Sequence, residues 1–181
     1  MVGLLAVSCK NESGESFFSK EQNVAVDIEL DGIRLVERVT INSETVVIPY
    51  QKYELENGLT VILHADRSDP LVHVDVTYHV GSAREDKGKS GFAHFFEHLL
   101  GKETKNMKSG EWYKILSSNG GNGNAATSVD LTYYYATMPS NSLKLGLWRY
   151  SEIMLHPIID QEGVDIQREA IKEEKITIKN L

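Results

Sequence analysis

The chain has 181 residues, of which 41% are hydrophobic and 25% charged, a composition typical of a globular domain with one hydrophobic core. Its formal net charge of −7 argues against nucleic acid as a partner, because no basic surface would neutralise the phosphates. No apolar run reaches the roughly 20 residues of a membrane-spanning helix, and the single cysteine, Cys9, excludes an internal disulfide and a cysteine-rich zinc site.

The first 22 residues are expected to lie outside the fold. Residues 1–9 form a short apolar run that ends in small residues and Cys9, and residues 10–22 are polar. This pattern is similar to the end of a bacterial lipoprotein signal, which predicts a lipid anchor at Cys9 and a place in the bacterial cell envelope or periplasm. The alternative is a disordered N-terminus with a buried or free thiol. The folded domain is then expected to span residues 23–181.

Strand patterns follow as far as residue 80. Residues 24–49 are strand-like, and residues 53–65 contain Asn57-Gly58 between two alternating runs, which predicts a hairpin. Residues 71–80 alternate apolar and polar side chains, as in a strand with one buried face. The polar positions include His73 and Asp75. These two could ligate a metal, but the alternation favours a solvated outer face.

Helical patterns dominate the rest of the chain. Helices are predicted at 90–100, where Gly101 can end the helix, at 110–118, at 141–155 after a cap at Ser140 or Asn141, and at 160–179. Strands are predicted at 124–128 and 131–138. The order of these elements predicts one α+β domain, with helices packed on a mostly antiparallel sheet.

Residues 90–101, S-G-F-A-H-F-F-E-H-L-L-G, concentrate the chemistry of the chain. On a helix, His94, Glu97 and His98 share one narrow arc of an otherwise apolar surface. Histidines at i and i+4 can both bind one zinc ion, and the order H-x-x-E-H is the inverted zincin signature. Glu97 would then be free to take a proton from zinc-bound water. The alternative is a pair of core or surface histidines without metal.

A catalytic zinc site usually needs a third protein ligand. The last helix offers four carboxylates, of which Glu174 shares a face with Gln167, Ile171 and Ile178. Glu174 therefore lies on the predicted core-facing side, where a zinc ion would pair with its charge. The alternative is a surface carboxylate at the acidic end of a helix.

Three separated motifs resemble one known family. They are G-F-A-H-F-F-E-H-L-L, then G-G-N-G-N-A-A-T-S-V-D-L-T-Y-Y, and then Q-R-E-A-I-K-E-E. In this order they resemble the pitrilysin/insulysin family of inverted-zincin metallopeptidases, which includes insulin-degrading enzyme and the mitochondrial processing peptidases. The resemblance covers about residues 50–175. It implies one half of a two-half clamshell metallopeptidase, the N-terminal half that carries the zinc.

The resemblance implies a role for each matching residue. His94, His98 and Glu174 would bind Zn²⁺, and Glu97 would be the general base of a zinc-dependent endopeptidase. Substrate-binding residues would be Asn124, Ala125 and Thr127, on an edge strand to which extended or unfolded peptides add as a further strand. Gln167 departs from the family, which often has Glu at this position; a Gln there can hydrogen-bond a ligand but adds no charge.

The resemblance also implies a partner. Family members work as two homologous halves, and the second half supplies an Arg/Tyr pair for the substrate carbonyl. This chain ends soon after Glu174, so the domain is expected to be truncated at its C-terminus and to need a second half or a partner subunit. The alternative function is a non-catalytic or partner-dependent subunit that binds peptide. The intact H-x-x-E-H motif favours catalysis.

Overall fold

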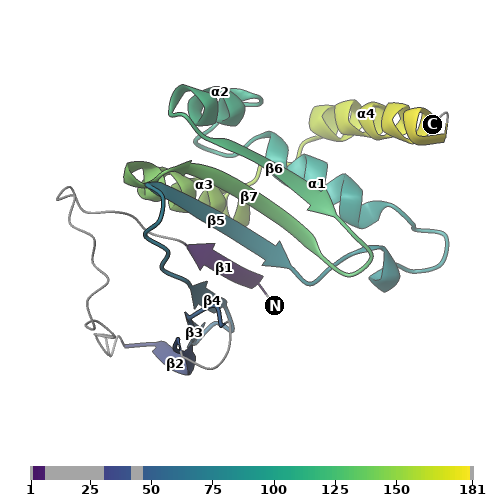
Figure 1. Ribbon diagram of the computed structural model, residues 1–181. Coiled ribbons are helices and arrows are strands. Elements are labelled where there is room, and N and C mark those ends of the chain that lie inside the picture. The colour runs from purple at the N-terminus through teal and green to yellow at the C-terminus, as the bar shows by residue number, and fades with distance from the viewer. Residues whose placement is uncertain (1, 7–30, 42–46, 180–181) are drawn as a thin grey trace.

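The computed structural model describes residues 2–6, 31–41 and 47–179. Their strands form one seven-stranded sheet in the order β2-β3-β4-β1-β5-β7-β6 (Figure 1). The strands are β1 (Val2–Ala6), β2 (Ile33–Val39), β3 (Tyr50–Leu55), β4 (Thr60–Leu63), β5 (Leu71–Tyr78), β6 (Asn122–Thr127) and β7 (Thr132–Pro139). All neighbours are antiparallel except β1 and β4. The predicted α+β class with a mostly antiparallel sheet is confirmed.

The helices gather on the β5-β7-β6 part of the sheet (Figure 1). Two short 3₁₀ turns, η1 (Ser82–Arg84) and η2 (Ser140–Ser142), precede α1 and α3. The α-helices are α1 (Phe92–Lys102), α2 (Glu111–Ser118), α3 (Leu143–Leu155) and α4 (Gln161–Lys179). Helices α1, α2 and α3 contact the sheet, whereas α4 packs on α1. The first and the last helix of the chain are therefore neighbours.

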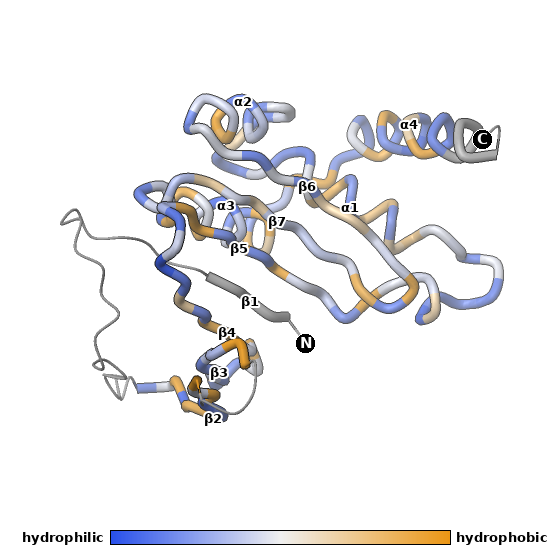
Figure 2. Tube along the Cα trace, in the orientation of Figure 1, coloured by the Kyte–Doolittle hydropathy of each residue, from blue (hydrophilic) through white to orange (hydrophobic). Residues whose placement is uncertain are grey.

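The core lies between this part of the sheet and the helices that cover it. Alternate residues of β5, which are Val72, Val74 and Val76, are at most 1% exposed, as the period-2 pattern predicts. Figure 2 shows the corresponding mixture of hydrophobic and hydrophilic residues along the strands and helices. The core cluster also includes Met107, Trp112, Leu116, Tyr134, Ala136, Met138, Tyr150 and Ile153. This packing holds α2 and α3 on the sheet.

The Asn57-Gly58 hairpin is confirmed. Strands β3 and β4 pair antiparallel on either side of it, and Gly58 has a φ of 83°, which L-residues with a side chain rarely adopt. The Asn57 side chain accepts a hydrogen bond from the Leu59 N–H at 3.0 Å. Here short-range turn chemistry is sufficient to define the structure.

The prediction that residues 1–22 lie outside the fold is wrong for Val2–Ala6. These residues form β1, parallel to β4 and antiparallel to β5, in the interior of the sheet. An apolar run of five residues satisfies the pattern of a buried strand as well as that of a signal segment, so the sequence alone did not separate the two. Cys9 lies outside the described residues, and its lipidation remains a prediction.

Several predicted boundaries also differ from the structure. Gly101 lies inside α1, which continues to Lys102, because a lone glycine is tolerated in a helix held by tertiary contacts. Helix α3 begins at Leu143, because the residues from Ser140 to Ser142 form the turn η2 first, and Ser142 is its N-cap. Of the predicted strand region 24–49, the described part contains only β2, and residues 47–49 are not in a strand.

Candidate metal centre

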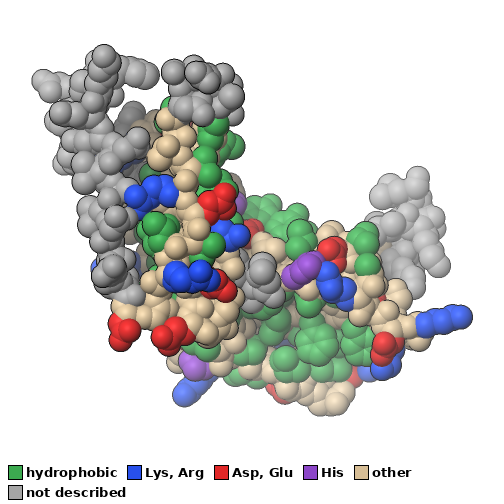
Figure 3. All heavy atoms as spheres, turned by 90° about the horizontal axis from the view of Figure 1, so that it is seen from below, with side chains coloured by type: hydrophobic (Ala, Val, Ile, Leu, Met, Phe, Trp, Pro, Cys, Tyr) green, Lys and Arg blue, Asp and Glu red, His purple; other side chains and the backbone are tan. Residues whose placement is uncertain are grey.

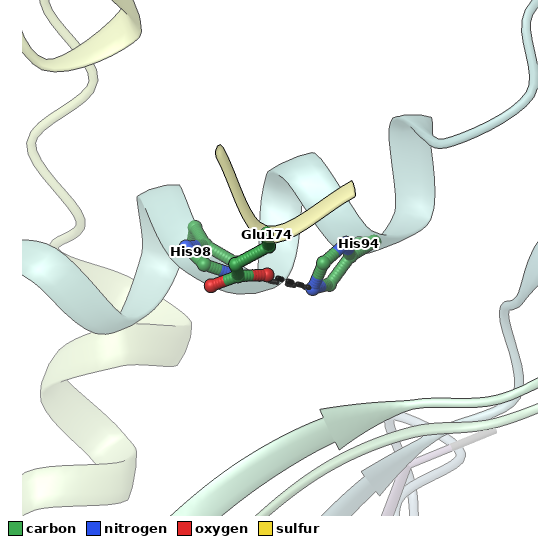
Figure 4. A group of neighbouring side chains, drawn as sticks. All are labelled: His94, His98 and Glu174. Carbon is green, nitrogen blue, oxygen red and sulfur yellow. Dashed lines mark hydrogen bonds and ion pairs between the residues drawn. The ribbon is translucent and has the colours of Figure 1, made fainter. Parts of the chain in front are cut away.

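Helices α1 and α4 bring the three predicted ligands together. His94 and His98 lie one turn apart on α1, and the Glu174 carboxylate of α4 lies between their rings (Figure 4). The two Nε2 atoms are 3.1 Å apart. One carboxylate oxygen lies 3.6 Å from His94 Nε2 and the other lies 3.7 Å from His98 Nε2. The structure thus brings the three residues close enough to share one ion.

These separations fit a zinc ion. Tetrahedral zinc with bonds of about 2.0–2.2 Å holds its ligand atoms roughly 3.3–3.6 Å from one another, close to the observed 3.1, 3.6 and 3.7 Å. Two imidazole nitrogens and a carboxylate form the donor set of many catalytic zinc sites. The Glu174 side chain is 48% exposed, more than its predicted place on a core-facing stripe implied. The cluster is therefore open to water on the side of Glu174.

A hydrogen bond from α4 orients His98. Its Nδ1–H donates to the Gln167 side-chain oxygen at 3.1 Å. Because a neutral imidazole carries one proton, this bond leaves Nε2 as a lone pair directed toward His94 and Glu174. Gln167 and Glu174 therefore act on His98 from the same face of α4. A partner for the second nitrogen is typical of histidines that bind a metal.

Glu97 lies on α1 beside the three ligands but outside their cluster. It is 9% exposed, and its carboxylate accepts a hydrogen bond from Thr127 Oγ1 at 2.6 Å. Thr127 in turn lies 3.2 Å from the Thr132 hydroxyl, and the Thr132 hydroxyl donates to the Val80 carbonyl oxygen at 3.1 Å. The sheet thus holds the carboxylate through side chains of β6 and β7. Such a carboxylate can accept a proton without binding a metal itself.

Tyr134 of β7 forms a hydrogen bond with the same turn of α1 from the sheet side. Its hydroxyl donates to the Glu97 carbonyl oxygen at 3.2 Å. Burial, and then the nearby Glu97 carboxylate, raise the pKa of Tyr134 well above its ordinary value. Tyr134 therefore stays protonated at neutral pH and acts as a hydrogen-bond donor to the helix.

An apolar cavity of about 360 Å³ lies beside α1. Glu97 lines it, but none of the three ligands does. Its walls include Phe92 and Phe96, which are 52% and 44% exposed, so this apolar side of α1 is open to solvent. Hydrophobic side chains gather on the face of the molecule seen from below (Figure 3).

The predicted substrate-binding residues all lie on β6, an edge strand of the described sheet. Asn124 is exposed, whereas Ala125 is half-buried and packs against the core cluster. The Thr127 hydroxyl is already bonded to Glu97. The side chains thus differ in their surroundings, and what the three residues share is the backbone of one strand.

Two contacts that the sequence reasoning missed hold the ends of α1. At the C-terminal end, the buried Arg149 of α3 donates from its Nη2 to the Gly101 carbonyl oxygen at 2.7 Å. At the N-terminal end, the Glu85 carboxylate accepts from the Gly91 and Ala93 backbone N–H groups, each at 2.7 Å. Two features of the sequence could have indicated these contacts. Arg149 lies within the otherwise largely apolar α3, and α1 begins after Gly91, which has no side chain to cap it.

The chain is similar to known proteins over most of its length. The model of the insulinase family (peptidase family M16) matches residues 60–180. Zinc protease PqqE of Helicobacter pylori is 34% identical over 137 residues, which are 75% of this chain and 31% of that protein. Human insulin-degrading enzyme is 32% identical over 126 residues, which are 69% of this chain and 12% of that protein.

A solved structure shows the same fold. The crystal structure of pitrilysin superposes with a TM-score of 0.71 and 23% identity, over 81% of this chain and 16% of that protein. The chain thus spans about a third or less of the relatives that it matches. Among the helices in the described part of the chain, none has the length and apolar composition to cross a membrane.

Proposed function

The chain belongs to the insulinase family, peptidase family M16, and we therefore propose that it carries the zinc centre of a metalloendopeptidase that cleaves extended or unfolded peptides. The observation that supports this most directly is the convergence of His94, His98 and Glu174 beside the Glu97 carboxylate. Relatives that are named zinc proteases point to the same metal. The three side chains are the proposed zinc ligands.

In the proposed mechanism each residue has a separate task. A zinc ion held by His94, His98 and Glu174 would supply Lewis acidity toward the scissile carbonyl and the attacking water. Glu97 takes a proton as general base and passes it to the leaving amine. Thr127 holds one carboxylate oxygen of Glu97 through a 2.6 Å hydrogen bond, which limits the directions in which the carboxylate can point. Gln167 keeps His98 in the tautomer that leaves Nε2 free to bind a metal.

Strand β6 is the proposed substrate platform. It pairs with β7 on one side, and no strand in the described part of the chain covers its other edge. A peptide that adds there, along Asn124, Ala125 and Thr127, would be recognised through its backbone, which would favour extended substrates. The same strand contacts α1, so an added peptide would lie near the metal centre.

A second, homologous half is the proposed partner. It would close over the centre and supply an Arg/Tyr pair to the substrate carbonyl, as the family resemblance implies. The alternative, a non-catalytic peptide-binding subunit, is less well supported, because Glu97 and all three candidate ligands are present and converge.

Metal analysis tests the proposed centre. We expect the purified, dialysed full chain to hold one zinc ion, and we expect His94→Ala and Glu174→Gln to lose it. Glu169→Gln is the matched control, because Glu169 also lies on α4 but pairs with Lys172 at 2.7 Å. Equal zinc content in the wild type and in all three variants would refute the ligand assignment.

A further inference from the structure

The first turn of α1 carries a proposed ligand but has no side-chain cap of its own. The first backbone N–H groups of a helix have no acceptor within the helix. Here the N-cap residue is Gly91, whose φ of 102° is left-handed and which has no side chain to accept a hydrogen bond. His94 is the third residue of α1, within this weakly capped turn.

Glu85 supplies the missing acceptor from outside the helix. One of its carboxylate oxygens accepts from the Gly91 N–H and the other accepts from the Ala93 N–H, each at 2.7 Å. Hydrogen bonds to a charged acceptor are stronger than those between neutral groups. A negative charge at a helix N-terminus is also favoured by the helix dipole. One carboxylate therefore restrains the backbone on both sides of Phe92, directly before His94.

The loop that carries Glu85 is itself attached to the sheet. The Ser82 and Ala83 N–H groups donate to the Ser128 and Val129 carbonyl oxygens at 3.3 and 2.8 Å. The next residue, Arg84, donates to the Asp130 carboxylate at 2.8 Å. Residues 128–130 form the turn between β6 and β7. A continuous set of contacts thus links this turn, through Glu85, to the first turn of α1.

We propose that Glu85 is a positioning residue of the metal centre, which fixes the first turn of α1 and thereby the direction of the His94 imidazole. The proposal rests on the proposed zinc site. Because His98 has its own partner in Gln167, a loss of Glu85 would disturb one histidine and leave the other in place. The consequence is a loss of metal affinity without the loss of any ligand.

The test is the zinc affinity of the full chain, measured by competition with a chromophoric chelator. We expect Glu85→Ala to weaken zinc binding about tenfold, the lower end of what the loss of a residue that orients a ligand costs. Glu85→Gln retains one acceptor oxygen and is expected to fall between wild type and Glu85→Ala. The control is Asp86→Ala, which removes the same charge from the same loop, where Asp86 pairs with Lys89; it should leave the affinity unchanged.

Cobalt separates this role from a general loss of stability. In Glu85→Ala, the d–d absorption of bound Co²⁺ should weaken or shift as the His94 contact is lost, and Glu85→Gln should restore part of it. If Glu85→Ala lowers the melting temperature of the metal-free chain but leaves the zinc affinity and the Co²⁺ spectrum unchanged, Glu85 is merely structural and the proposal is wrong. It is also wrong if Asp86→Ala weakens zinc binding equally. A wild-type chain that binds no zinc would refute the proposed function itself, and this inference with it.

Discussion

Two residues at the proposed metal centre, His98 and Glu97, hold their conformation through a second contact. His98 uses Nδ1 for Gln167 and Nε2 for the proposed ion, and Glu97 uses one oxygen for Thr127. These contacts come from α4 and β6, which are distant from α1 in the chain. Such supporting bonds set ligand orientation and protonation, so their loss should change metal affinity or rate in a predictable direction.

Gln167 offers the clearest test of this kind. Gln167→Leu removes the acceptor for His98 Nδ1–H, and we expect zinc affinity to fall by about 10–100-fold. Gln167→Glu retains an acceptor and adds a negative charge, so it should bind zinc at least as tightly as the wild type. Competition with a chelator measures the zinc affinity of both variants. Equal affinities for all three chains would show that the 3.1 Å bond does not orient the ligand.

Glu97→Gln separates catalysis from metal binding. The amide has nearly the same shape as the carboxylate and can still accept a hydrogen bond from Thr127, but it cannot accept the proton. We expect one zinc ion per chain to be retained and the cleavage of a quenched peptide to fall by at least about 10²-fold. The assay uses the form of the chain that is active, alone or with a second half. Cleavage at the wild-type rate would exclude Glu97 as the base.

At the scale of elements, helix α1, which carries two of the proposed ligands, is held from several directions. Arg149 of α3 holds its C-terminal carbonyl, Tyr134 of β7 holds a central one, and Glu85 holds its first turn. Its neighbour β6 lies so close to β7 that a side chain at Gly123 would meet the Tyr135 carbonyl oxygen. A methyl group at Gly123 of β6 would therefore clash, whereas one at Gly101 of α1 would have room.

Two glycine substitutions test this difference. Gly123→Ala would press a methyl group against β7 and should destabilise the chain by about 1–3 kcal/mol, the usual cost of overpacking. Gly101→Ala should instead stabilise it by about 0.5–1 kcal/mol, because Gly101 lies inside α1 and its Cβ would meet only Tyr134, at 4.0 Å. Chemical denaturation of both variants measures the two effects. If both substitutions changed the free energy of unfolding in the same direction, the packing described for β6 or for α1 would be wrong.

For the whole molecule, the main feature is that β6 remains an open edge beside the metal centre in the described sheet. Glu174, a proposed ligand, is half-exposed. The chain matches only part of its relatives, 31% of one and 12% of another. If a zinc centre forms here, a second half would be needed to exclude water and to supply donors for a developing oxyanion.

We therefore expect the isolated full chain to bind zinc but to cleave peptides weakly. The loss of one oxyanion donor alone typically costs about 10²–10³ in rate. The exposed edge of β6 should also promote self-association. Adding a homologous second half, in the same chain or as a separate one, should restore cleavage. The measurement is a peptidase assay with light scattering, with and without that half, and full activity from a monomer alone would contradict the two-half requirement.

Short-range chemistry was sufficient for much of this protein. The H-x-x-E-H spacing places His94 and His98 on one side of any helix that contains them, because the helical period is close to four residues. The Asn57-Gly58 turn defines its hairpin, and the alternation along β5 identifies the buried valines. The helix periodicity also selected Glu174 from the carboxylates of α4. Each of these features depends on residues close together in the chain.

Tertiary structure decided the contacts between distant residues. Packing of α4 on α1 brings Glu174 within 3.6–3.7 Å of two histidines, and the sheet brings Thr127 to Glu97. The loop contacts of Glu85 and the insertion of Val2–Ala6 between β4 and β5 are of the same kind. No local periodicity encodes them, because they depend on how separate elements dock. The candidate residues of the centre were therefore readable from the sequence, whereas the contacts that hold them in place required the fold.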